Sequence, residues 1–149
     1  MDYENTHQLG RLILKLGNAL IKNRNHDLEV LGLTASQADS LQFFLENPQS
    51  TATDLKDYLG VTHQTAHGLV QRIKEKNLVT LSHSLSDGRC RAIMPTECGK
   101  SLGAKMAYNR ERTSIRLLSG MTEEEKKLFY RLLNVAYENI KNQEMEMLS

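Results

Sequence analysis

Two short amphipathic helices joined by a tight turn constrain this sequence more than any other feature. Thr51 is a typical N-cap residue, and the helix after it ends at Gly60, which suits the left-handed position at a helix C-terminus. Thr62 then caps a second helix over residues 63–76. The apolar residues of this second helix recur at helical spacing and predict one buried stripe: Ala66, Leu69, Val70 and Ile73. This arrangement predicts a helix-turn-helix.

The apolar spacing changes from a helical to an alternating period after Asn77. Residues 78–82 and 91–94 favour two short strands, and the polar stretch between them contains the turn-favouring pair Asp87-Gly88. The strands and their turn predict a β-hairpin, here called the wing. A helix-turn-helix followed directly by such a hairpin is a winged helix-turn-helix.

Long helices are predicted on both sides of this motif. Apolar spacing favours a long helix over residues 5–31 and a second over residues 35–46, which begins with the capping box of Thr34 and Gln37. Thr96 caps a further long helix, and Thr122 begins the last one. The predicted fold class is therefore mainly α with a small β-hairpin wing, a winged helix-turn-helix flanked by long helices.

Composition narrows the function classes. The 149 residues contain no apolar run long enough to cross a membrane, and the N-terminus does not resemble a secretory signal. With only two cysteines, a reduced cytoplasmic setting is expected. A Gly-rich phosphate loop, a nucleophile elbow and convincing metal-ligand spacing are all missing, so we expect no enzymatic activity, no cofactor and no metal.

A winged helix-turn-helix has dimensions that suit double-stranded DNA. A helix fits the major groove, its N-terminus attracts phosphate, and a basic hairpin tip can reach the neighbouring backbone. The candidate DNA-contacting residues on the second short helix and the wing are Thr62, His63, Gln64, Thr65, His67, Arg72, Arg89 and Arg91. Lys74 and Lys76 follow nearer the end of that helix.

Two observations leave other interpretations open. The formal net charge is only +1, so charge alone does not indicate nucleic-acid binding, and exposed polar residues on a helix are often simply solvated. A protein-interaction module with weak DNA binding is therefore an alternative. His63 and His67 lie four residues apart and could also bind a metal, although no third ligand is obvious nearby.

The combined motifs resemble the multiple-antibiotic-resistance regulator (MarR) family. The matching segments are residues 33–37, 54–62, 78–79, 87–89 and 96–99, and the likeness extends over nearly the whole chain. The resemblance implies one chain, residues 1–149, with a DNA-binding lobe over residues 33–97 and dimerisation helices over residues 5–31 and 98–148. It also implies a homodimer that represses transcription at a palindromic operator and is modulated by a small ligand, whose binding residues the sequence does not identify.

The resemblance assigns roles to particular residues. Thr65 and its neighbours match the family's major-groove readers, Arg89 matches a wing-tip arginine that reaches DNA, and Asp87 matches the acidic residue that steadies that arginine. Gly68 stands where the family often has a polar or basic residue. Cys90 and Cys98 leave a cysteine-based redox sensor as a further alternative, although the first helix has no cysteine.

Overall fold

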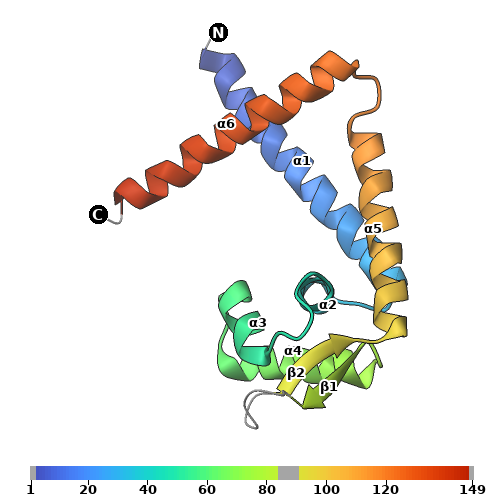
Figure 1. Ribbon diagram of the computed structural model, residues 1–149. Coiled ribbons are helices and arrows are strands. Elements are labelled where there is room, and N and C mark those ends of the chain that lie inside the picture. Colours follow the sequence, from blue (N-terminus) through green and yellow to red (C-terminus); the bar gives the residue numbers. More distant parts are fainter. Residues whose placement is uncertain (1–2, 84–90, 148–149) are drawn as a thin grey trace. The chain divides into compact units, whose positions relative to one another are not determined.

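The computed structural model describes residues 3–83 and 91–147 and consists mainly of helices with one β-hairpin (Figure 1). The elements in chain order are α1 (Tyr3–Val30), α2 (Ala35–Glu46), α3 (Ala52–Leu59), α4 (His63–Glu75), β1 (Val79–His83), β2 (Arg91–Pro95), α5 (Glu97–Leu117) and α6 (Glu123–Met147). This order confirms the predicted fold class. The chain divides into two compact units, residues 1–111 and residues 112–149, which are described separately.

The helix starts are set by local side-chain caps. Thr34 and Gln37 form the predicted capping box of α2, and Thr51 forms an equivalent box with Asp54 at the start of α3. Gly60 adopts φ 64° at the end of α3, a left-handed conformation in which glycine carries no Cβ penalty. Asn77 adopts φ 59° and turns the chain from α4 into the hairpin. Each of these turns follows from residues within a few positions, which is why the sequence predicts them.

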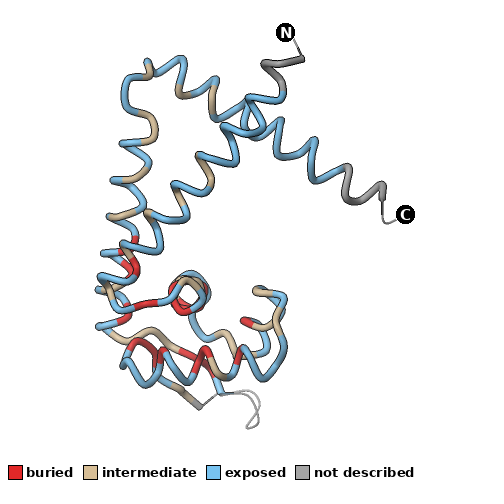
Figure 2. Tube along the Cα trace, turned by 180° about the vertical axis from the view of Figure 1, so that it is seen from behind, coloured by how far each residue is buried: buried red, intermediate tan, exposed pale blue. Residues whose placement is uncertain are grey.

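The core of the first unit lies among α2, α3, α4 and the wing, where the buried residues gather (Figure 2). All four residues predicted for the inner stripe of α4 are buried. The largest fully buried side chains are Phe44, Leu41, Leu55, Ile73 and Ile93. Since these side chains come from α2, α3, α4 and β2, the wing and the helix-turn-helix share one apolar core.

The wing is an antiparallel pair of strands with Leu81 opposite Ile93. The Ile93 amide donates to the carbonyl of Ser50, 2.9 Å away, and so ties β2 to the segment before α3. The first strand begins at Val79, one residue later than predicted, because the Leu78 amide still bonds the Ile73 carbonyl of α4 at 2.9 Å. Backbone bonds at Ile93 of β2 and at Leu78, just before β1, therefore tie the wing to the helix-turn-helix.

The second unit contains the end of α5 and the whole of α6. Gly120 adopts φ 85° between the two helices, and Thr122 and Glu125 cap α6 as predicted, with the Thr122 amide 2.8 Å from the Glu125 carboxylate. Several large apolar side chains of α6 remain exposed: Leu128, Leu132, Leu133, Val135 and Ile140. Within the described residues, no helix is both long and apolar enough to cross a membrane.

Candidate nucleic-acid interface

Helix α4 turns its apolar stripe inward and its predicted DNA-contacting residues outward. The side chains of Thr62, His63, Gln64, Thr65, His67 and Arg72 are all exposed. The helix has this orientation because Ala66, Leu69, Val70 and Ile73 anchor its other face in the core. The structure thus brings these six residues onto the solvent side of one short helix.

The N-terminus of α4 is held by two threonines. The Thr62 hydroxyl accepts a bond from the Thr65 amide at 3.2 Å, and the two hydroxyl oxygens lie 2.9 Å apart. The first turn of a helix also leaves backbone amides without intrahelical partners, and these amides favour anions. Exposed hydroxyls and free amides together make this end of α4 able to bind phosphate oxygens.

An open groove of about 700 Å³ runs between α2 and the outer side of α4. It brings together Gln64, Thr65 and Arg72, three of the predicted residues. Its other walls come from α2 and the turn after α3 and include Ser36 and Asp39, which sequence reasoning missed. Their presence depends on how α2 crosses α4, and no local sequence signal reports such a crossing.

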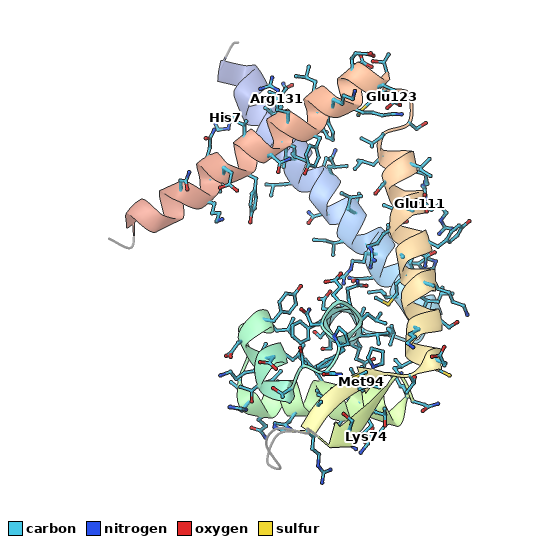
Figure 3. All side chains as sticks on the ribbon, in the orientation of Figure 1. His7, Lys74, Met94, Glu111, Glu123 and Arg131 are labelled. Carbon is cyan, nitrogen blue, oxygen red and sulfur yellow. The ribbon has the colours of Figure 1, made fainter. Side chains whose placement is uncertain are left out.

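A second groove, of about 350 Å³, lies between α4 and the wing. It joins His67 of α4 to Arg91 of β2, two predicted residues that are far apart in the sequence. Lys74 lines the same groove and lies on the lobe formed by α2–α4 and the wing (Figure 3). With Lys74 and Arg91 on its rim, this groove is basic. Lys74 was not among the residues predicted from the sequence to contact DNA.

Lys76 has a different role from its neighbours on α4. Its ammonium group donates to the Gly32 carbonyl at 2.8 Å, which joins the C-terminus of α4 to the turn after α1. Asp87 and Arg89, the predicted wing-tip pair, and Cys90 lie outside the described residues, so their predicted roles stay predictions.

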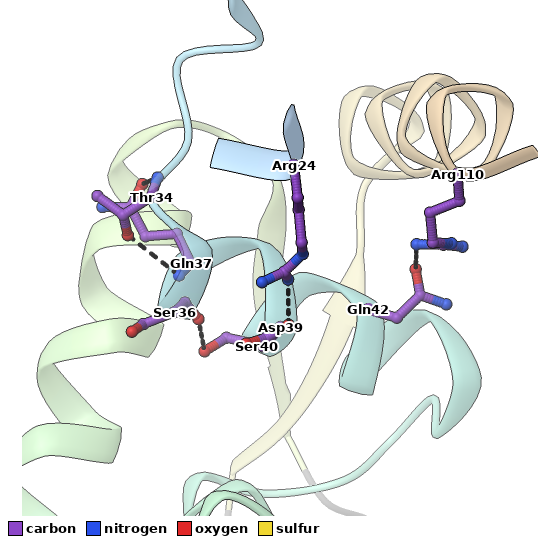
Figure 4. Close-up of polar contacts among 8 residues, drawn as sticks. All are labelled: Arg24, Thr34, Ser36, Gln37, Asp39, Ser40, Gln42 and Arg110. Carbon is purple, nitrogen blue, oxygen red and sulfur yellow. Dashed lines mark hydrogen bonds and ion pairs between the residues drawn. The ribbon is translucent and has the colours of Figure 1, made fainter. Parts of the chain in front are cut away.

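Two arginines connect the long helices of the first unit to α2 (Figure 4). Arg24 of α1 forms an ion pair with Asp39 at 2.5 Å, and Arg110 of α5 donates to the Gln42 side chain at 3.2 Å. Since Asp39 also lines the groove beside Arg72, Arg24 balances a negative charge at the edge of that groove.

His63 and His67 stack with their ring centroids 6.2 Å apart, and both are exposed. Across the described part of the chain, no cluster of three or more His, Cys, Asp or Glu residues is placed to hold a metal ion. Cys98 is exposed at the start of α5, with the Asn77 side-chain amide 3.9 Å from its sulfur.

Known proteins share both the sequence pattern and the fold. Residues 31–89 match the model of the MarR family. The chain is 24% identical over 125 residues to the HTH-type transcriptional repressor Rv2887 of Mycobacterium tuberculosis, covering 84% of this chain and 90% of that protein. A structure of that MarR-family protein in complex with salicylic acid has a TM-score of 0.64 at 23% identity, covering 86% of this chain and 95% of that one.

Two further solved structures have the same fold. A MarR family protein from Bacillus stearothermophilus has a TM-score of 0.78 at 22% identity, with 95% of this chain and 99% of that chain covered. A mutant of S. aureus MepR bound to an oligodeoxyribonucleotide has a TM-score of 0.71 at 20% identity, with 89% and 97% covered. The winged helix-turn-helix segment is thus similar to the MarR family model, and solved MarR-family structures share the fold over nearly the whole chain.

Proposed function

We propose that this protein is a sequence-specific DNA-binding transcription regulator that represses genes in the cytoplasm. The observation that carries the proposal is the outward face of α4, which lies beside two grooves and carries six exposed polar or basic side chains. Five of them lie at the N-terminal cap and first turns of the helix, and Arg72 lies in its last turn. The name of the relative Rv2887 as a repressor and the oligodeoxyribonucleotide bound by the MepR mutant support it. The relative Rv2887 is named as a transcriptional repressor, which also supports the proposal that this protein is not an enzyme.

The proposed contacts divide into those that read bases and those that hold the backbone. Gln64 is suited to the hydrogen-bonding edge of adenine, and Thr65 to a thymine methyl group or a phosphate. Basic and polar side chains and the capping hydroxyl can instead bind the sugar-phosphate backbone, a contact that carries no sequence information directly. We assign backbone contacts to Thr62, His63, His67, Arg72 and Arg91 and to the wing-tip Arg89, which Asp87 orients.

We further propose that the protein acts as a homodimer on a palindromic operator. Helices α1 and α6 each leave large apolar side chains exposed in the single chain, among them Leu12 at 61% and Ile140 at 63%. Such faces mark surfaces that another protein chain covers. In this proposal residues 5–31 and 98–148 build the dimer, and residues 33–97 form the DNA-binding lobe. A two-fold dimer then presents two copies of α4 to two half-sites.

A small-molecule effector completes the proposal. The relative Rv2887 has been solved with salicylic acid, which supports a small aromatic acid as the class of compound to screen. The effector would act by shifting the dimer toward a state with lower affinity for DNA, since a ligand changes an equilibrium only through its differential affinity for two states.

Fluorescence anisotropy tests the proposal directly. The purified full chain is titrated onto a labelled duplex from upstream of its own gene and onto a scrambled duplex, at several salt concentrations. We expect tighter binding to the upstream duplex and a steep loss of affinity as salt rises. Failure to bind either duplex at low salt would refute the proposal and favour the protein-interaction module.

A further inference from the structure

Gly68 lies in the middle of the outward face of α4. Gln64 precedes it by four residues and Arg72 follows it by four, so the three residues succeed one another along one stripe of the helix. All three line the groove between α2 and α4. This stripe of the helix therefore carries a long side chain at Gln64 and at Arg72 and no side chain at Gly68 between them.

The fold does not require glycine at position 68. A Cβ added there meets no atom within 4 Å, and Gly68 is not among the residues with positive φ. Two other helical glycines differ sharply: a Cβ at Gly99 would lie 2.1 Å from the Leu78 carbonyl oxygen, and one at Gly103 would lie 2.4 Å from Leu45 Cδ1. Glycine inside a helix lowers its stability, so packing gives no reason for Gly68.

Neighbouring side chains do not fill the space over Gly68. The Gln71 amide donates to the Glu75 carboxylate at 3.0 Å, and the Thr65 hydroxyl lies against that of Thr62. Gly68 is half-buried on the groove wall rather than protruding from the helix. Its backbone therefore stands back from any base edge that the longer side chain of Gln64 reaches.

We propose that Gly68 sets a gap in base recognition, so that the base pairs facing the middle of α4 are read only weakly. This inference rests on the proposed DNA-binding function. Gln64 and Arg72 are separated by about 12 Å along the helix axis, which corresponds to roughly three base-pair steps of about 3.4 Å. The operator half-site is accordingly specified at the base pair that Gln64 contacts and is tolerant over the next two or three.

The test compares three full-length proteins on a set of operator duplexes that carry every base pair at each half-site position. The proteins are the wild type, Gly68→Asn and Gly68→Ala. The Gln64→Ala variant first locates the base pair that Gln64 reads. We expect the wild type to discriminate by less than about twofold at the tolerant positions, whereas Gly68→Asn gains a preference for adenine of about 5- to 150-fold at one of them.

Gly68→Ala is the matched control, because it adds a Cβ and strengthens the helix but brings no hydrogen-bonding group. It should keep the wild-type pattern. Tenfold discrimination by the wild type at the tolerant positions would overturn the inference, as would a Gly68→Asn pattern identical to that of the wild type. A uniform loss of affinity in Gly68→Ala would also overturn it, since that loss would mean that glycine permits close approach of the helix to DNA. If the wild type shows no sequence preference at all, the proposed function itself fails.

Discussion

At the scale of single residues, Arg24 affects the charge of a surface to which it does not itself belong. It balances Asp39, whose carboxylate lines the groove beside Arg72. We expect Arg24→Ala to weaken DNA binding by about 0.3–1 kcal/mol at low salt, because an unbalanced carboxylate then faces the phosphates and both side chains are about half exposed. Titration of a labelled duplex by anisotropy measures this change.

Two controls separate charge balance from loss of a cation. Lys22→Ala removes an exposed cation of the same helix that lies outside this groove, and it should have a smaller effect. The double variant Arg24→Ala/Asp39→Asn should bind nearly as well as the wild type. If the double variant binds as weakly as Arg24→Ala, Asp39 is not the cause of the loss.

Glycines of this chain differ in how strongly packing requires them, and stability measurements distinguish them. Gly99→Ala should destabilise the protein by about 1–3 kcal/mol, because its Cβ would lie 2.1 Å from the backbone carbonyl oxygen of Leu78. Gly68→Ala should instead raise the free energy of unfolding by about 0.5–1 kcal/mol, because open space receives its Cβ. Urea unfolding of the two variants gives both values, and equal destabilisation would contradict this account of α4.

At the scale of elements, the sequence predicts those features that depend on residues a few positions away in the chain. The caps at Thr34, Thr51 and Thr62 and the end of α3 at Gly60 are local, and each lies where it was predicted. The two grooves depend on how α4 packs against α2 and the wing, and periodicity carries no information on such crossings. Asp39 and Lys74 were for this reason not predicted as site residues, although Gln64, Thr65 and Arg72 were.

Arg72 and Lys76, two cations near the end of the element α4, have different surroundings. Arg72 lines the groove, whereas the Lys76 ammonium group bonds the Gly32 carbonyl. We expect Arg72→Ala to weaken binding to every duplex and to reduce the slope of log affinity against log salt by about 1 per protomer. Lys76→Ala should leave that slope nearly unchanged, and equal slopes for the two variants would show that Arg72 contacts no phosphate.

At the scale of the whole molecule, the exposed apolar faces of α1 and α6 predict that the protein forms an oligomer in solution. Leu132 of α6 is 48% exposed. If a second copy covers it, Leu132→Glu should shift the protein from dimer to monomer in sedimentation velocity, because a charge buried without a partner is costly. Arg131→Glu, at an exposed neighbouring position of the same helix, is the control and should remain dimeric. A dimer in both variants would place the interface elsewhere.

The central claim is that the first turns of α4 read base sequence, and Gln64 tests it most directly. The measurement compares the affinity of wild-type protein and of Gln64→Ala for the operator and for a random duplex at one salt concentration. We predict that Gln64→Ala loses about 1–3 kcal/mol of binding free energy on the operator and binds the random duplex almost as tightly as the wild type does. The reason is that the variant loses a base contact and keeps every phosphate contact. Equal losses on the two duplexes would contradict a role for α4 in reading sequence.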